Sequence, residues 1–393
     1  MSNRTSETPP KNKKNLTRFI LVILMLAGGA LFGYFIGGYL RGGRPAAAPT
    51  TPTQYKLLLL PMILGIIFLV LAIHELGHVF AGISVGFEFR MITVGPFMFR
   101  KEADQSGKKR LRFRWNTRLN AMGGLALCLP KSDHQLRSKF IKFIAGGPLA
   151  SLFLALLAFA VYWFFYRGTP SFFTRSFWAF TALMSGLIFL TTIIPMRSGG
   201  FFSDGGRMLN LFRGGPKAEV DLAILTSTAE ATSGIRPREM NMAPLQKILA
   251  RNYQHPFIPY LHLYMYAHLL DWNKPDEAWN HLEKTMEAVD SIPTGYQAMV
   301  WLEVAFYQAY YQQDLSEAEA YFQRAKISAV IPKHLIYKSE AVIAQLKGDT
   351  TLALAKAQAA LEVLPQAMDK GAAIAEKEWL EKFMSEINNS LQN

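Results

Sequence analysis

Residues Leu57–Ile83 read LLLLPMILGIIFLVLAIHELGHVFAGI, an apolar run whose only ionisable side chains fall in the segment His74-Glu75-Leu76-Gly77-His78. An apolar stretch of this length is typical of a helix that crosses a membrane, since about 20 apolar residues span the hydrocarbon core. Ionisable residues inside such a helix are energetically costly and seldom lack a partner or a purpose. The three polar side chains therefore indicate a functional site within a membrane-spanning helix.

The spacing of the two histidines predicts a metal site. Residues four apart on a helix project about 40° apart and one turn along the axis, so His74 and His78 share one face. Two neutral imidazoles in this arrangement are suited to bind zinc. Glu75 is offset by about 100° around the helix, which allows it to act as general base on a zinc-activated water molecule without binding the metal. The competing interpretation, two core histidines beside a glutamate that reaches the membrane interface, leaves three neighbouring polar groups unexplained.

A catalytic zinc site needs a third protein ligand, and the membrane half of the chain offers few candidates. Asp204 is the only Asp or Glu in residues 140–214. We therefore expect one zinc ion to be held by His74, His78 and Asp204. His134 is the other candidate, but it lies in a basic loop and is expected to be solvated. The competing interpretation of Asp204 is a helix N-cap that follows a glycine-rich turn.

Composition divides the chain into two halves. Half of the 393 residues are hydrophobic and only 18% are charged, an unusual balance for a soluble protein. Residues 1–214 hold 26 Lys and Arg against 7 Asp and Glu (+19), and residues 215–393 hold 16 against 22 (−6), which together give the net charge of +13. The excess positive charge thus lies beside the apolar runs, as in loops between membrane helices, and indicates no nucleic-acid partner. The single cysteine, Cys128, excludes intramolecular disulfides and cysteine-based metal clusters.

Three further apolar runs predict membrane helices at residues 19–40, 140–166 and 177–195. The first run follows a basic tail, residues 1–18, that is expected to be disordered; the alternative, a cleavable signal peptide, is opposed by the length of the run. Residues 97–115 predict a β-hairpin, because their second half alternates basic and apolar side chains. The predicted fold class is an all-α membrane protein with four transmembrane helices, a small membrane-associated β-hairpin and a soluble domain of α-helical repeats.

The distribution of Lys and Arg over the loops predicts the orientation. Residues 86–139 hold twelve of them, whereas residues 41–56 hold three and residues 167–175 hold two. We therefore expect a multi-pass protein of the plasma membrane with both termini in the cytoplasm. His74 then lies 18 residues (74 − 56) beyond Lys56 on the outer side. That distance is about 27 Å along the helix axis and places the metal near the cytoplasmic edge of the bilayer.

After Gly214-Gly215-Pro216 the pattern takes a helical period, and residues 216–393 are predicted to form a cytoplasmic helical domain. Segments that begin helices after polar turns align on Ala278, Ala318 and Ala353, with spacings of 40 and 35 residues (318 − 278 and 353 − 318). The pattern resembles tetratricopeptide repeats, whose period is about 34 residues and which stack helix pairs into a binding surface. We expect this domain to recruit a protein partner; a generic helical bundle is the alternative.

Over residues 55–213 the chain resembles the site-2 protease family of intramembrane zinc metalloproteases. The segment Ile73–His78 matches the family's His-Glu-x-x-His helix. Residues 145–151, AGGPLAS, resemble the family's Gly-Pro segment on the next helix, with Ser151 where asparagine is usual. The resemblance implies that Gly147, Pro148 and Ser151 bind substrate or support the metal-binding motif.

The family's last motif, Asn-x-x-Pro leading into Leu-Asp-Gly, is matched less closely. Thr192 and Pro195 stand for the asparagine and the proline, and Ser203 replaces the leucine before Asp204. The interval from proline to aspartate is nine residues (204 − 195), longer than is usual in the family. If Asp204 is a ligand, the added Arg197-Ser198-Gly199-Gly200 has to loop out. The resemblance makes Thr192 and Pro195 further substrate-binding or motif-supporting residues.

The resemblance implies hydrolysis of peptide bonds in or near the transmembrane segment of a membrane protein, usually in regulated intramembrane proteolysis. It also implies that the hairpin at 97–115 pairs with an unwound substrate strand, since helical peptide bonds must be opened before hydrolysis. A basic hairpin lying on anionic lipid is the alternative.

Two other functions compete with this prediction. The first is a catalytically degenerate membrane scaffold that acts through its helical repeats, and intact Glu75 opposes it. The second is a membrane-anchored peptidase for soluble peptides, and the unbroken apolar run Leu57–Ile73 opposes it.

Overall fold

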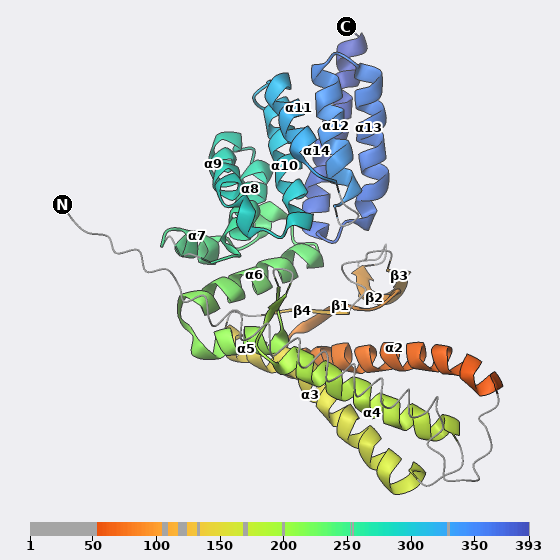
Figure 1. The fold of residues 1–393 in the computed structure, drawn as a ribbon. Helices are drawn as coiled ribbons and strands as arrows, with labels where there is room; N and C mark the ends of the chain where they lie inside the picture. Colours follow the sequence, from red (N-terminus) through yellow and green to blue (C-terminus); the bar gives the residue numbers. More distant parts are fainter. Residues whose placement is uncertain are drawn as a thin grey trace. The chain divides into compact units, whose positions relative to one another are not determined.

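The computed structural model describes residues 53–103, 109–116, 124–131, 134–167, 172–198, 201–251, 253, 255–327 and 331–392 (Figure 1). The predicted basic tail at 1–18 and the predicted helix at 19–40 lie outside these residues. Within the described ranges the chain forms thirteen α-helices, α2–α14, and a small antiparallel sheet. The coarse prediction of a mostly helical chain with long apolar helices and a small β-element is confirmed.

Three helices are long and apolar enough to cross a membrane: α2 (Thr53–Ser84), α3 (Leu136–Val161) with its π-helical continuation η2 (Tyr162–Tyr166), and α4 (Phe172–Ile193). Many of their large apolar side chains are exposed, Leu60 by 66%, Phe153 by 68% and Phe164 by 77%. Such exposure is expected of helices that place these side chains in lipid. Three of the four predicted spans thus correspond to candidate membrane helices in the described part of the chain.

The first half of α2, the second half of α3 and α4 pack on one another. Met62 and Ile66 of α2 are buried against Phe180 of α4. Ser151 of α3 is fully buried, and its carbonyl oxygen accepts a hydrogen bond of 2.7 Å from the hydroxyl of Ser185 in α4. Small hydroxyl side chains hold membrane helices together in this way, because lipid offers no competing partner.

Four short strands form the antiparallel sheet, in the order β3-β2-β1-β4: β1 (Glu88–Val94), β2 (Phe97–Ala103), β3 (Lys109–Trp115) and β4 (Leu125–Leu129). The hairpin expected at 97–115 corresponds to β2 and β3, in which Phe99 pairs with Phe113. This register places the aromatic side chains of the hairpin on one face and its arginines on the other. The strands β1 and β4 were not predicted from the sequence. They enlarge the hairpin into a sheet whose described edges are β3 and β4.

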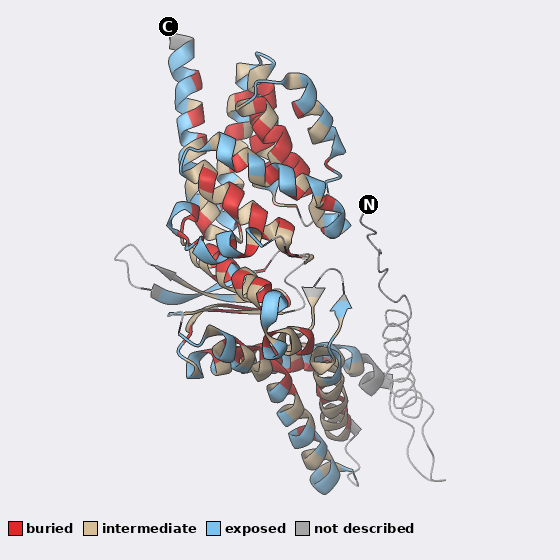
Figure 2. Cartoon of the chain, turned by 90° about the vertical axis from the view of Figure 1, so that its left-hand side faces the viewer, coloured by how far each residue is buried: buried red, intermediate tan, exposed pale blue. Residues whose placement is uncertain are grey.

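The rest of the described chain is helical. A short α5 (Asp204–Arg213) and a longer α6 (Gly215–Ser233) precede a 3₁₀ turn, η3 (Pro237–Glu239), and α7 (Ala243–Leu249). Three helix pairs follow: α8 (Ile258–Asp271) with α9 (Pro275–Glu287), α10 (Thr294–Tyr310) with α11 (Leu315–Arg324), and α12 (Lys333–Leu346) with α13 (Thr350–Val363). The long α14 (Lys370–Gln392) ends the chain. Figure 2 shows the buried residues of this region concentrated between neighbouring helices.

The three helix pairs share one construction. Each turn between paired helices contains a residue with positive φ: Asn273 (55°), Gln313 (55°) and Gly348 (82°). The fourth residue of each second helix is an alanine with no exposed surface: Ala278, Ala318 and Ala353. A methyl group at this position allows close approach of the two helix axes. The alanine spacing read from the sequence thus corresponds to three equivalent helix pairs.

Candidate metal centre

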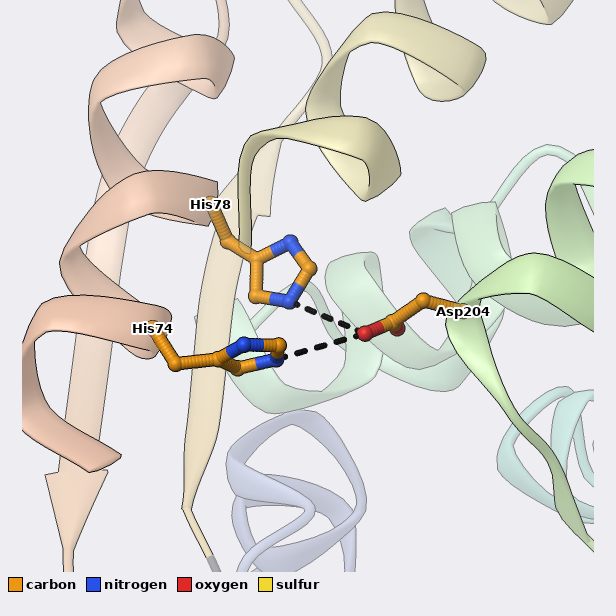
Figure 3. Close-up of side chains that lie close together, drawn as sticks. All are labelled: His74, His78 and Asp204. Atoms are coloured by element: carbon orange, nitrogen blue, oxygen red, sulfur yellow. Dashed lines mark ion pairs between the residues drawn. The ribbon is translucent and has the colours of Figure 1, made fainter. Parts of the chain in front are cut away.

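Two histidines near the C-terminal end of α2 converge on one aspartate at the start of α5 (Figure 3). Nε2 of His74 lies 3.3 Å, and Nε2 of His78 lies 3.5 Å, from Oδ2 of Asp204. Both imidazoles are buried, and the candidate ligand atoms of all three residues lie within 4.8 Å of one another. In the described ranges, no other group of three or more His, Cys, Asp or Glu side chains could hold a metal ion.

The distances between these side chains fit a metal better than direct hydrogen bonds. Ligand atoms at about 2.05 Å from a tetrahedral zinc ion are about 3.3 Å from one another, close to the 3.3 and 3.5 Å found here. Charge-assisted hydrogen bonds are shorter, about 2.7–2.9 Å. Burial alone would raise the pKa of Asp204, but the neighbouring imidazoles of His74 and His78 lower it below its usual range, which keeps the carboxylate ionised. Two imidazole nitrogens and a carboxylate oxygen therefore fit a catalytic zinc ion.

The backbone of α3 holds the second nitrogen of His78. This Nδ1 lies 3.0 Å from the carbonyl oxygen of Phe143 and 3.3 Å from the backbone nitrogen of Gly147. The first contact needs a proton on Nδ1 and the second needs a lone pair there, so only one of them is a hydrogen bond. We assign the shorter one, in which Nδ1–H donates to Phe143 and the lone pair of Nε2 is left for a metal.

Glycines bring α3 against α2 at the level of the histidines. A Cβ on Gly147 would lie 2.2 Å from Nε2 of His78. A Cβ on Gly77 would lie 2.3 Å from the carbonyl oxygen of Gly146, and one on Gly146 would lie 2.2 Å from the carbonyl oxygen of Gly77. No side chain fits at these positions without displacing a helix or the imidazole. Gly147, which the family resemblance implies as a site residue, therefore lacks a side chain where the imidazole of His78 has to fit.

The edge strand β4 contacts the carboxylate of Glu75. This side chain is buried, with 7% of its residue surface exposed, and accepts a hydrogen bond from the backbone N–H of Ala126. Gly124, just before β4, packs against it so closely that a Cβ there would lie 2.4 Å from Oε1. Gly124 also has a φ of 111°, which residues with a side chain rarely adopt. Glu75 is thus fixed close to the candidate ligands without being one of them.

Asp204 is presented at the first position of α5, and the N-cap of this helix is Ser203. The hydroxyl of Ser203 accepts hydrogen bonds of 3.1 Å from the N–H groups of Gly206 and Met196, and it donates one of 2.7 Å to the carbonyl of Ile194. The competing interpretation of Asp204 as the N-cap is therefore wrong. The neighbouring serine caps the helix, and the Asp204 carboxylate faces the histidines.

The lengthened interval before Asp204 folds back so that its two ends are hydrogen-bonded to each other. It contains a hairpin of two short strands, β5 (Arg197–Ser198) and β6 (Phe201–Phe202), with Arg197 opposite Phe202. At its base the backbone N–H of Ser203 donates a 2.9 Å hydrogen bond to the carbonyl of Met196. The described residues of this interval thus fold back on one another, and α5 starts beside the end of α4.

The other residues expected from the resemblance lie on α3 and at the end of α4. Pro148 lies inside α3, and Ser151 is buried three residues further on. Thr192 is half-buried in the last turn of α4, and Pro195 is exposed just beyond it. His134, the alternative ligand, is exposed just before α3. None of these five residues belongs to the cluster of candidate ligands.

Four residues that support the site were missed from the sequence: Phe143, Gly124, Ala126 and Ser203. Phe143 and Ala126 act through backbone groups, which every residue type has, so the sequence gives no indication of their role. Ser203 could have been found, because serine is a preferred N-cap residue and acidic residues such as Asp204 are common in the first turn of a helix.

Comparison with known protein families gives one match. The model of a family described as peptidase family M50 matches residues 62–300, more than half of the 393-residue chain. This range includes all three candidate ligands and Glu75. No curated protein and no solved structure matches the chain.

Proposed function

The chain belongs to peptidase family M50, and on that premise we propose that it is a zinc endopeptidase that cleaves membrane proteins in or near their transmembrane segments. The family consists of membrane metalloproteases, which agrees with the three apolar helices of the described chain. The observation that carries the proposal is that Asp204, at the start of α5, converges on His74 and His78, which lie within the candidate span Leu58–Ser84.

In this proposal His74, His78 and Asp204 hold one zinc ion, and Glu75 acts as acid and base. A bound zinc ion supplies Lewis-acid activation of water and of the substrate carbonyl. Glu75 accepts a proton from the attacking water as its oxygen bonds to the carbonyl carbon, and donates that proton to the leaving amide nitrogen as the C–N bond breaks. The N–H of Ala126 holds the carboxylate in place throughout. The enclosed position of Glu75 keeps bulk water from competing for this proton.

We propose that the substrate adds to β4 as an extended strand. The family resemblance implies this role for the hairpin at 97–115, but β2 is an inner strand and β3 is the edge on the opposite side of the sheet from β4. β4 is the edge that contacts Glu75. Strand addition supplies backbone hydrogen bonds to a substrate segment that has lost its helical ones.

Photo-crosslinking distinguishes the two edges of the sheet. We expect a photoreactive residue at Leu125 in β4 to crosslink a single-span substrate in a Glu75→Gln background, where the substrate is not consumed. The matched position in β3 is the exposed Leu111, from which crosslinking should be several-fold weaker. A stronger signal from Leu111 than from Leu125 would restore the hairpin as the pairing element.

We further propose that the three helix pairs form a tetratricopeptide-like domain that recruits a protein substrate or regulator. The repeated turns and the buried alanines support this assignment. The Lys and Arg distribution supports a cytoplasmic domain on a plasma-membrane protein with both termini inside. A domain of this kind suits regulated intramembrane proteolysis, in which a partner controls access to the protease.

Metal removal tests the proposed function. We expect full-length protein in detergent to contain about one zinc ion per chain, and cleavage of a single-span substrate to stop on chelation and return on zinc addition. Asp204→Ala should lose most of the zinc, because two imidazoles alone bind it weakly. The control is Glu219→Ala, which removes an exposed carboxylate paired with Arg251. Cleavage that survives complete removal of zinc would refute the proposal.

A further inference from the structure

The hairpin β5–β6 connects the metal site to the helical region. Its last residue, Phe202, lies two positions before Asp204, and it belongs to the segment that is longer than is usual in the family. The ring of Phe202 lies 5.9 Å from that of Phe257 in an edge-to-face arrangement (83°) and 6.3 Å from that of His255, nearly stacked (29°). The guanidinium carbon of Arg197 lies 5.6 Å from the Phe202 ring centre on the hairpin itself. The hairpin therefore docks on the chain just before α8.

Phe257 links this contact to the core of the helical region. It is 7% exposed and belongs to the apolar cluster that includes Leu245 of α7 and Leu261 and Met265 of α8. Phe202 is half-buried against the same cluster. The side chain two residues before a candidate metal ligand is thus packed against the apolar core of the helical region, just before α8.

The backbone between Phe202 and Asp204 is tightly held. Ser203 makes hydrogen bonds through both its hydroxyl and its N–H, which tie it to Met196, Ile194 and Gly206. Because these bonds join the base of the hairpin to the first turn of α5, we expect a shift of Phe202 to be passed on to Asp204. Metal sites require ligand distances within about 0.2 Å of their ideal values, so a small displacement of Asp204 is enough to weaken binding.

We propose that Phe202 is a positioning residue for the third metal ligand, and that the helical region sets the zinc affinity of the site through Phe257 and Phe202. This inference rests on the proposed function, since it requires that Asp204 bind zinc. Its consequence is regulatory: a protein partner that moves the start of α8 changes metal occupancy, and hence protease activity, without touching the membrane helices.

Zinc affinity of the full-length protein tests the proposal, measured by competition with a chromophoric chelator in detergent. Phe202→Ala and Phe257→Ala are each expected to weaken zinc binding by about 10- to 100-fold, the range typical of groups that orient metal ligands. The double variant should bind zinc about as tightly as the more affected single variant, because both substitutions break the same contact. Phe202→Tyr retains the ring and should remain within about threefold of wild type. The matched control, Phe212→Ala, removes a phenylalanine of α5 that is 75% exposed and should change nothing.

Two further readouts separate positioning from general destabilisation. The visible spectrum of the cobalt-substituted protein reports ligand geometry, and it should change in Phe202→Ala but not in Phe212→Ala. If Phe202→Ala does not fold, Phe202→Leu carries the test, since it retains apolar volume and loses the ring contacts. Unchanged affinity and spectrum in Phe202→Leu and Phe257→Ala would overturn the inference while leaving the zinc site intact. A wild-type protein that binds no zinc would instead refute the proposed function.

Discussion

Glu75→Gln is expected to abolish peptide-bond hydrolysis while zinc remains bound with near wild-type affinity. Glutamine has nearly the same shape as glutamate, and its carbonyl oxygen can still accept the hydrogen bond from Ala126. The amide cannot accept a proton from water, so the step assigned to Glu75 is lost. Removal of a general base lowers rates by about 10²- to 10⁴-fold, and loss of proton donation to the leaving nitrogen adds to this effect. Because Glu75 is outside the cluster of candidate ligands, zinc content should not follow activity.

The measurement is cleavage of co-expressed single-span proteins, together with zinc content of the purified protein. Glu88→Gln is the matched control: it makes the same chemical change in β1, where the carboxylate pairs with Arg90 and Lys101. That variant should cleave at the wild-type rate. Undiminished cleavage by Glu75→Gln would contradict the mechanism. The scaffold alternative from the sequence analysis predicts no cleavage by either protein, wild type or variant, and a phenotype that depends only on the helical repeats.

The features that the sequence predicted best are those encoded by local spacing. The apolar run before His74 and the four-residue interval to His78 specify a helix and one of its faces, wherever the rest of the chain lies. The alanines at 278, 318 and 353 mark equivalent places in three helix pairs for the same reason, because a helix pair is built from neighbouring segments. Asp204 was predicted as a ligand because it is the only Asp or Glu in residues 140–214. Its position beside the two histidines could not be predicted from sequence spacing.

The features that escaped sequence reasoning depend on contacts between distant segments. β4 is a five-residue apolar run, Leu125–Leu129, too short to distinguish a strand from part of a buried helix. Its pairing with β1 and its contact with Glu75 arise only when the segments meet. The hydrogen bond from His78 to the carbonyl of Phe143 joins positions 65 residues apart and would form with any residue type at 143.

The segment that looked least compatible with the family pattern has a simple structural explanation. Four extra residues between Pro195 and Asp204 would displace the ligand if they lengthened the path of the chain. Instead, Arg197 and Ser198 pair with Phe201 and Phe202 as β5–β6, and the backbone N–H of Ser203 donates a hydrogen bond to the carbonyl of Met196 at the base of these strands. The longer interval therefore still brings Asp204 to the histidines, and the ring of Phe202 in β6 gives the helical region a direct contact with the ligand-bearing segment.

Gly147→Ala is expected to weaken zinc binding by more than about 100-fold, and to abolish cleavage, without unfolding the membrane helices. The new Cβ would lie 2.2 Å from Nε2 and 2.6 Å from Cε1 of His78, so the imidazole has to swing away. A side chain can do so at modest energetic cost, but its Nε2 is then lost to the metal. Orienting groups alone are worth about 10- to 100-fold in metal affinity, and loss of a ligand should exceed that. Alanine also favours a helix over glycine by about 1 kcal/mol, which protects the fold from the change.

Gly65→Ala and Gly186→Ala are the matched controls, on α2 and α4. A Cβ at Gly65 meets no heavy atom of the described chain within 4 Å, and one at Gly186 meets only Ala155 at 4.0 Å. Both variants should retain zinc and activity, since they make the same helix-stabilising change away from His78. Zinc content, cleavage and thermal stability in detergent are compared across the three variants. Full zinc retention in Gly147→Ala would show that His78 binds no metal through Nε2. A parallel loss in Gly65→Ala would show that the effect comes from helix packing rather than from the ligand.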